Sequence, residues 1–126
     1  KPKIKLVSKN VKEIVYKDLF DSDEEKIVML ENIRFYPEEE KNNQLFAKQL
    51  ATLAEIYVND AFSCSHRAHT SIDEITNFLP CYSGLQLDLE VYALKKITSE
   101  IKKPITCIIG GSKVSTKINI IKNLIP

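Results

Sequence analysis

The stretch from 27 to 58, IVMLENIRFYPEEEKNNQLFAKQLATLAEIYV, decides the fold class of this chain. Its first four residues form a short apolar run that is typical of a buried strand. A helical pattern follows, which Asn42 or Asn43 can cap and which extends to about Ala54, and residues 56–58 then form a second apolar run. Two short strands joined by a helix predict parallel pairing with a right-handed crossover.

The segments on either side continue this alternation of strands and helices. Before this stretch we expect a strand over 4–7 and a helix from Val11 to about Phe20, capped by Asn10. After it we expect a helical turn over 71–77 capped by Ser71, a helix over 85–98 and a strand over 105–109. A final helix should follow Ser112, with one apolar face formed by Val114, Ile118, Ile121 and Ile125. We therefore predict an α/β fold, a parallel sheet with flanking helices.

Three local patterns carry more specific expectations. Phe46, Leu50 and Leu53 mark the buried face of the helix that precedes the strand at 56–58. Pro37 is expected to stop regular structure, and the charged run at 38–41 is most simply a solvated turn. The helix over 85–98 is apolar on more than one side, which predicts packing on two sides.

Length and composition exclude several classes of protein. The 126 residues suffice for about one domain. A net charge of +1 gives no basic excess of the kind that nucleic-acid binding requires, and no apolar run approaches the roughly 18 residues of a membrane span. Three widely spaced cysteines, Cys64, Cys81 and Cys107, argue against a disulfide framework and favour a reducing, cytoplasmic location. Because the chain starts at Lys1 and not at Met, we expect an internal piece of a longer protein.

Only two of the eighteen basic residues are arginines, Arg34 and Arg67. Arginine presents a planar fork that binds a carboxylate or phosphate through two parallel hydrogen bonds, whereas lysine is a point charge. Both arginines follow β-type runs, and the loops after strands are where open α/β sheets bind ligands. The pair is therefore a candidate anion clamp, with two ordinary surface arginines as the alternative.

Arg67 lies in a loop with two histidines, Ser65-His66-Arg67-Ala68-His69. Three cationic or potentially cationic groups within four residues suit an anionic substrate. Zinc binding by Cys64, His66 and His69 is a competing interpretation, although zinc would need a fourth ligand or an open position and would have to tolerate Arg67. Exposed loop histidines without a role remain the third possibility.

Gly110-Gly111-Ser112-Lys113 lies between the predicted strand at 105–109 and the final helix. Glycines allow a ligand to approach the backbone, and a helix N-terminus offers free N–H groups to a phosphate. Lys113 and Lys117 are four residues apart and so lie near one another on that helix. The spacing of a Walker A loop is absent, and an ordinary turn with solvated lysines is the alternative.

Four stretches together resemble the phosphoglycerate kinase family. They are LENIRFYPEEEKN (30–42), YVNDAFSCSHRAHTS (57–71), FLPCYSGLQLDLEVYAL (78–94) and IIGGSKVSTKI (108–118), in the order of that family. The resemblance covers about residues 27–126. It implies part of the Rossmann-like, phosphoglycerate-binding N-terminal lobe over 1–84, the interlobe helix over 85–100 and the first βα unit of the nucleotide-binding lobe over 101–126.

The resemblance also implies an activity and roles for single residues. The family transfers a phosphoryl group reversibly between 1,3-bisphosphoglycerate and ADP, giving 3-phosphoglycerate and ATP in glycolysis, with Mg²⁺ bound to the nucleotide. The implied roles are substrate binding for Arg34, Arg67, His66 and His69, stabilisation of the transferring group for Lys113, and nucleotide binding for Lys113, Lys117, Gly110 and Gly111. We expect the complete enzyme to be a monomer without nucleic-acid or membrane partners.

The chain departs from the family in what it contains. The early substrate segment, the adenine site and the acidic Mg²⁺ segment are absent, so the resemblance assigns no metal ligand here and predicts that this piece alone is inactive. Ser63 stands where the family usually has glycine. A non-catalytic α/β anion-binding module and a zinc-binding interaction domain remain as alternative functions.

Overall fold

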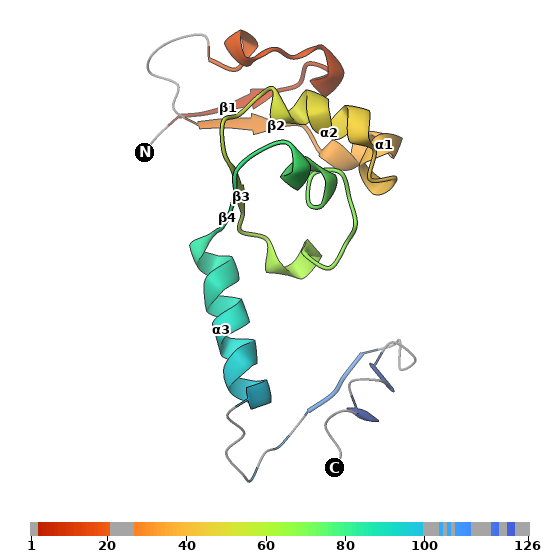
Figure 1. Ribbon diagram of the computed structural model, residues 1–126, viewed down its shortest axis with the longest axis vertical. Coiled ribbons are helices and arrows are strands. Elements are labelled where there is room, and N and C mark those ends of the chain that lie inside the picture. Colours follow the sequence, from red (N-terminus) through yellow and green to blue (C-terminus); the bar gives the residue numbers. More distant parts are fainter. Residues whose placement is uncertain are drawn as a thin grey trace. The chain divides into compact units, whose positions relative to one another are not determined.

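The computed structural model describes residues 3–20, 27–99, 104, 106, 108–111, 117, 118, 121 and 122 (Figure 1). Its chain forms two compact units, Lys1–Leu94 and Lys95–Pro126, and each is described by itself. The predicted substrate residues, Arg34, His66, Arg67 and His69, all lie in the first unit.

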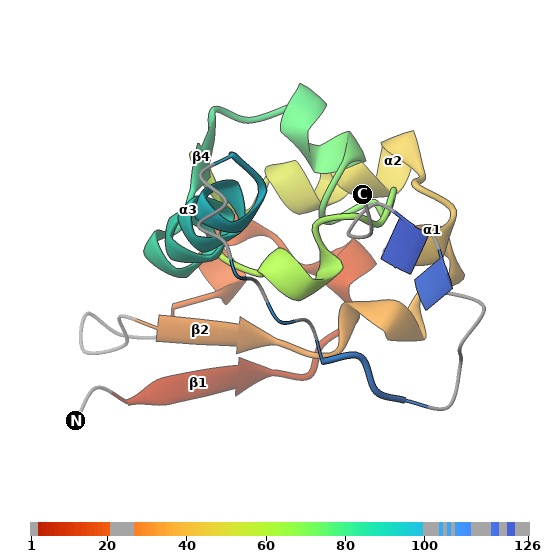
Figure 2. The ribbon, with the colours of Figure 1, turned by 90° about the horizontal axis from the view of Figure 1, so that it is seen from below.

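Two pairs of parallel strands form the framework of the first unit. Strand β1 (Ile4–Val7) pairs with β2 (Ile27–Leu30), and Figure 2 shows the two arrows side by side and pointing the same way. Strand β3 (Tyr57–Asn59) pairs in parallel with β4 (Cys81–Ser83). The predicted α/β class, with parallel strands and flanking helices, is confirmed, although the described strands form two sheets of two strands each.

Two helices connect β2 to β3. The short helix α1 (Pro37–Glu40) begins at Pro37, so the expectation that this proline stops regular structure is wrong. A proline fits the first position of a helix because its missing N–H would have no intrahelical partner there. Asn43 caps α2 (Gln44–Ala51), as its side chain accepts a hydrogen bond from the Phe46 N–H at 2.9 Å. This cap confirms the start of the helix predicted from the sequence.

The core of the first unit lies between these helices and the β1–β2 pair. The predicted buried residues are confirmed, since Phe46 and Leu50 of α2 and Leu53, in the turn just after it, are all buried. The segment after β1 contributes Val11 and Ile14, which are both fully buried. The complete cluster consists of Val7, Val11, Ile14, Leu19, Phe46, Leu50, Leu53 and Ile75.

The helix predicted from Val11 to Phe20 is wrong. Two short 3-10 helices, η1 (Val11–Glu13) and η2 (Tyr16–Asp18), stand in its place. The Asn10 side chain does cap η1, accepting from the Lys12 N–H, but the Asp18 carboxylate accepts from the Val15 N–H at 3.2 Å. Such local bonds from Asn and Asp side chains compete with a continuous helix.

Two further expectations for the first unit need correction. The turn predicted over 71–77 is the 3-10 helix η5 (Glu74–Asn77), and Ser71 does not cap it. Strand β4 was not predicted, because its three residues are exposed and follow the structure-breaking Pro80. Both features depend on contacts with distant parts of the chain and not on local sequence pattern.

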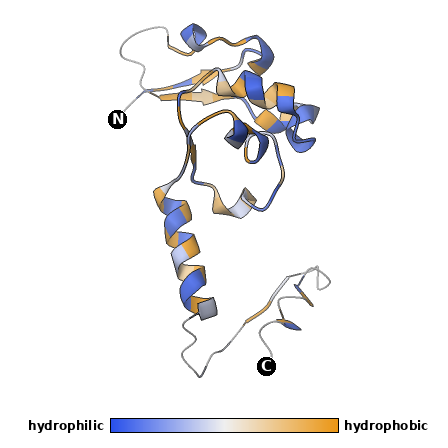
Figure 3. Cartoon of the chain, viewed as in Figure 1, coloured by the Kyte–Doolittle hydropathy of each residue, from blue (hydrophilic) through white to orange (hydrophobic). Residues whose placement is uncertain are grey.

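Helix α3 (Leu85–Ser99) agrees with the helix predicted over 85–98. Its first turn is capped by the residue that follows β3, because the Asp60 carboxylate accepts from the Leu87 N–H at 2.9 Å. Figure 3 shows hydrophobic and hydrophilic residues interspersed along it. No described residue of α3 is buried, so the described part of the chain does not pack against it on two sides.

In the second unit only part of the predicted strand and helix can be compared. Residues 106, 108 and 109 do not form the strand predicted over 105–109, and residues 105 and 107 lie outside the described residues. Residues 118, 121 and 122 are helical, in agreement with the final predicted helix. Val114 and Ile125 lie outside the described residues.

A candidate anion-binding site

Arg34 is presented by a short turn directly after β2. It lies in the 3-10 helix η3 (Ile33–Phe35), where the Asn32 side chain caps the turn by accepting from the Arg34 N–H at 3.0 Å. The side chain of Arg34 is exposed. Because η3 continues through Tyr36 into α1, the backbone of Arg34 is fixed on both sides.

Arg67 is presented by the loop that follows β3. Asn59, at the end of that strand, accepts from the Ala61 N–H at 3.0 Å and donates to the Ser65 hydroxyl at 3.3 Å. The Ser65 hydroxyl in turn donates to the Ala61 carbonyl at 2.9 Å, which closes the 3-10 helix η4 (Phe62–Cys64). The Arg67 N–H then bonds the carbonyl of the residue that ends η4, at 3.0 Å. The loop is thus held by its own polar side chains.

His66 and Arg67 share one shallow hollow of about 250 Å³. The residues that line it are Ser65, His66, Arg67, Ala68, Ile72 and Asp73. Both basic side chains are exposed, as an arriving anion requires. The acidic member of the lining, Asp73, accepts a hydrogen bond from the Asn42 side chain at 2.7 Å. Arg34 is not among the lining residues, so the structure brings together one arginine and one histidine of the predicted set.

His69 has a different environment from His66. Its side chain is only 13% exposed, and its Nδ1 atom lies 3.9 Å from Oε1 of Glu39. That distance is too long for a hydrogen bond, and Nδ1 of His69 is buried without a hydrogen-bond partner. The imidazole therefore packs beside a carboxylate, and its predicted role in substrate binding stays a prediction.

Glu39 is the residue that sequence reasoning missed. The run 38–41 was interpreted as a solvated turn, but Glu39 is only 1% exposed within α1, so that interpretation is wrong for this position. Its carboxylate accepts two hydrogen bonds from Ser71, from the N–H at 2.9 Å and from the hydroxyl at 2.6 Å. No local pattern distinguishes Glu39 from its exposed neighbour Glu40, because its partner lies on a distant segment.

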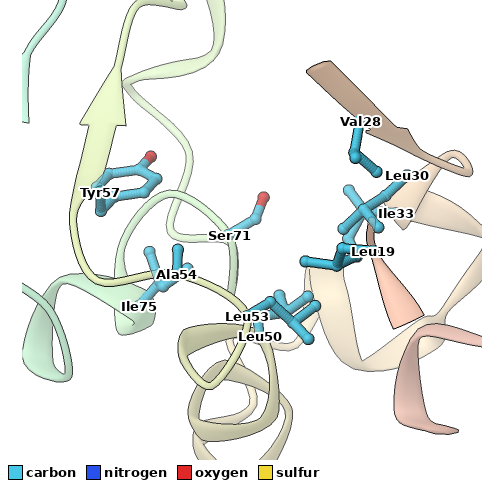
Figure 4. Close-up of a pocket in the computed structure, with 10 residues that line it drawn as sticks. All are labelled: Leu19, Val28, Leu30, Ile33, Leu50, Leu53, Ala54, Tyr57, Ser71 and Ile75. Atoms are coloured by element: carbon cyan, nitrogen blue, oxygen red, sulfur yellow. The ribbon is translucent and has the colours of Figure 1, made fainter. Parts of the chain in front are cut away.

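An apolar hollow of about 350 Å³ lies elsewhere in the first unit (Figure 4). Val28, Leu30 and Ile33 line one side of it, and Tyr57 and Ile75 line the other. Burial, with smaller contributions from neighbouring acidic groups, raises the pKa of Tyr57 above its ordinary value of 10.0. The lining includes no charged side chain, so this hollow does not suit an anion.

The glycine pair in the second unit is partly described. Gly111 has a φ of 116°, a left-handed conformation that other residues rarely adopt. The Lys117 ammonium group donates a hydrogen bond to the Gly110 carbonyl, which brings one predicted nucleotide-binding lysine onto the glycine turn. Lys113, the predicted catalytic residue, lies outside the described residues.

The proposed zinc ligands do not assemble. In the described part of the chain, which includes Cys64, His66 and His69, no group of three histidine, cysteine or acidic side chains is arranged to hold a metal ion. The Cys64 thiol instead donates to the Ala61 carbonyl at 3.4 Å. This observation contradicts the zinc alternative for these three residues.

A family model for phosphoglycerate kinase matches residues 1–126, the whole of the chain. The chain belongs to the phosphoglycerate kinase family. The phosphoglycerate kinase of Wolbachia pipientis wMel is 52% identical over 122 residues, which are 97% of this chain and 31% of that protein. The Bartonella bacilliformis enzyme is 52% identical over 102 residues, 81% of this chain and 26% of that protein.

Solved structures give the same result. Phosphoglycerate kinase from Coxiella burnetii superimposes with a TM-score of 0.72 at 36% identity, covering 96% of this chain and 30% of that one. The enzyme from Pyrococcus horikoshii OT3 superimposes with a TM-score of 0.75 at 26% identity, covering 96% and 31%. The chain thus spans about a quarter to a third of the length of the relatives that it matches. Among the described residues, no helix has both the length and the apolar character that crossing a bilayer demands.

Proposed function

We propose that this chain is the part of a phosphoglycerate kinase that carries one side of the phosphoglycerate site and the beginning of the nucleotide site. The complete enzyme would transfer a phosphoryl group reversibly between 1,3-bisphosphoglycerate and ADP, giving 3-phosphoglycerate and ATP. The observation that carries this proposal is the exposed pair of His66 and Arg67 in one hollow after β3, in a chain that belongs to this family.

The proposal divides the chain between two lobes. Residues 1–84 would belong to the substrate lobe, 85–100 to the interlobe helix and 101–126 to the nucleotide lobe. Arg34, Arg67, His66 and His69 would bind phosphoglycerate. Gly110, Gly111, Lys113 and Lys117 would contact the nucleotide phosphates, and Lys113 would also stabilise the transferring group.

This division of charge suits the chemistry of phosphoryl transfer. The reaction requires little covalent help from the protein, but it requires in-line placement and positive charge around the equatorial oxygens of the transferring group. Arginine forks would fix the orientation of the phosphoglycerate, and lysines would follow the moving phosphoryl group as point charges. Closure of the two lobes would exclude water and so prevent hydrolysis of ATP.

Magnesium would accompany the nucleotide and neutralise its phosphates. We assign no residue of this chain to the metal ion. We also propose that the complete enzyme works as a monomer in glycolysis, in the cytoplasm and without nucleic acid. Cys64 and Cys81 are free thiols, which fits a reducing compartment.

Substitution of Arg67 tests the substrate assignment. In a complete kinase that carries this segment, Arg67→Lys keeps the charge but loses the bidentate fork, so we expect the KM for 3-phosphoglycerate to rise about tenfold, a loss of about 1.4 kcal/mol. The KM for ATP should change less than about twofold. Lys48→Arg, at an exposed position of α2, is the matched control and should change neither constant. An equal loss for both substrates would contradict the assignment.

A second experiment tests self-sufficiency. We expect the purified 126-residue chain to show no turnover of 3-phosphoglycerate and ATP, because it would contain only part of each site. A coupled assay of ADP formation at high protein concentration measures this directly. Turnover that persists through repeated purification would refute the proposal that the chain holds incomplete sites.

A further inference from the structure

Glu39 is a buried carboxylate on the one-turn helix α1, where Glu38 is partly exposed and Glu40 is exposed. Only 1% of Glu39 is exposed, whereas Glu40 beside it is exposed. Transferring a carboxylate from water into a protein interior is costly unless hydrogen bonds compensate for the lost solvation. A chain that buries a carboxylate at this point therefore gains an interaction there, and the partners of Glu39 show what that interaction is.

The partners of the Glu39 carboxylate lie on the segment that follows Arg67. The two oxygens of Glu39 accept from the N–H and the hydroxyl of Ser71, at 2.9 and 2.6 Å. The backbone carbonyl of Glu39 accepts from the Thr70 N–H at 2.9 Å. The fully buried Thr70 hydroxyl donates to the carbonyl of Glu38 and accepts from the N–H of Asn43, each at 2.8 Å. Thr70 and Ser71 are therefore fastened to α1 at several adjacent points.

The fastened segment connects the elements that carry the two arginines. Arg34 lies in η3, which leads directly into α1, and Arg67 lies only two residues before His69. The side chain of His69 packs beside the Glu39 carboxylate at 3.9 Å. The bonds between Glu39 and Ser71 therefore tie the end of the loop that bears Arg67 to the helix that follows Arg34.

We propose that Glu39 is a positioning residue for phosphoglycerate binding, which fixes the loop bearing His66 and Arg67 against the helix that follows Arg34. The inference rests on the proposed function of the two arginines. Glu39 itself is buried and touches no substrate. It acts through Ser71, and its effect should therefore fall on the affinity for phosphoglycerate and not on the nucleotide side of the reaction.

The physical reason is the geometry that bidentate recognition requires. An arginine fork gains its second hydrogen bond only if its plane meets the anion in the correct orientation. Small displacements of positioning groups can cost large factors in enzymatic rate or binding. A loop held only by its own turn would leave Arg67 free to sample many orientations, whereas the Glu39–Ser71 pair limits them.

Substitution by leucine removes both acceptors at nearly constant volume. In the complete kinase, Glu39→Leu leaves the N–H and hydroxyl of Ser71 without a partner, and we expect the KM for 3-phosphoglycerate to rise about tenfold. The KM for ATP should stay within about twofold. Glu40→Leu makes the same change at an exposed position of the same helix and is the matched control, which should leave both constants unchanged.

A conservative variant separates positioning from charge. In Glu39→Gln the amide oxygen can accept from the Ser71 N–H while the amide nitrogen donates to the Ser71 hydroxyl, so the KM for 3-phosphoglycerate should stay within about threefold of the parent value. If Glu39→Leu does not fold, Ser71→Ala tests the same positioning role. It removes only the hydroxyl bond and should raise the KM for 3-phosphoglycerate about threefold, with the KM for ATP unaltered.

The outcomes distinguish this inference from the function on which it rests. Arg67→Lys is measured in parallel, and if it leaves the KM for 3-phosphoglycerate unchanged, the substrate assignment fails and the role of Glu39 fails with it. If Arg67→Lys raises that constant and Glu39→Leu does not, or if Glu39→Leu raises both KM values equally, only the positioning role is refuted. A rise confined to 3-phosphoglycerate, with recovery in Glu39→Gln, supports it.

Discussion

Replacement of Gly84 by alanine tests how tightly β3 is joined to the start of α3. A Cβ atom at position 84 would overlap the Cβ, Cγ and Oδ1 atoms of Asp60. Gly84 also donates from its N–H to the Asn59 carbonyl at 2.7 Å, which fixes its backbone in place. Because the Asp60 carboxylate caps α3 through the Leu87 N–H, any movement that relieves the overlap also weakens this cap.

The expected cost follows from three contributions. Overpacking of a fixed site costs about 1–3 kcal/mol, and loss of a helix cap costs about 1 kcal/mol. Gly84 does not have a left-handed backbone, so alanine can adopt its conformation, and the lower entropy of alanine in the unfolded chain stabilises the folded state by about 0.4–1 kcal/mol. We therefore expect Gly84→Ala to lower the free energy of unfolding by about 2 kcal/mol.

Urea denaturation followed by far-ultraviolet circular dichroism measures this free energy. Gly110→Ala is the control, because a Cβ at Gly110 would meet no heavy atom within 4 Å. Asp60→Gly removes all three overlapping atoms, so the cost of Gly84→Ala should fall below about 0.5 kcal/mol in that background. An equal cost in both backgrounds would show that the Asp60 contact is not its cause, and no cost in the parent chain would refute the reasoning altogether.

Three further substitutions address the core and two titrating groups. Ile14→Ala should lower the free energy of unfolding by about 3 kcal/mol, because Ile14 is fully buried, whereas Val15→Ala at the exposed neighbour should cost less than about 1 kcal/mol, both by urea denaturation. Burial raises the pKa of Tyr57, so the contribution of the neutral Tyr57 side chain to stability is complete below pH 10.0 and is lost above it. Tyr57→Phe should therefore lessen the loss of stability at alkaline pH, as measured by thermal melts at increasing pH. The hydrogen bond from Lys12 at 2.6 Å lowers the pKa of Glu38, so the contribution of the ionised Glu38 carboxylate to stability is present above pH 4.5 and is lost on acidification. Glu38→Gln should therefore reduce the dependence of the melting temperature on pH in the acid range.

Local signals allowed the elements between β2 and β3 to be predicted. Asn43 was a candidate cap because its side chain can accept from the N–H three residues on, and the structure contains that bond to Phe46. The apolar spacing of Phe46, Leu50 and Leu53 gave the correct buried face, since a helix brings residues three and four apart to one side.

What the sequence did not indicate depends on contacts between distant segments. Glu39 carries the same charge as Glu40, and only the approach of Ser71 makes one of them buried. The Asp18 carboxylate divided an apolar helical pattern into two turns by accepting from the Val15 N–H, an alternative that periodicity does not represent. Arg67 does lie in the loop after a strand, where its side chain is exposed, but the sequence pattern did not indicate that His69 lies beside Glu39.

The two parallel strand pairs have a consequence for the order of folding. Each crossover closes a chain loop of nearly the same length, from Ile4 to Ile27 and from Tyr57 to Cys81, so loop-closure entropy favours neither. The first crossover contributes Val11, Ile14 and Leu19 to the core, while the second contributes only Ile75. We therefore expect amide exchange to be slower in β1 and β2 than in β3 and β4. The loop bearing Arg67 lies within the second crossover, so the half of the unit that holds this loop would be the last to form and the first to open.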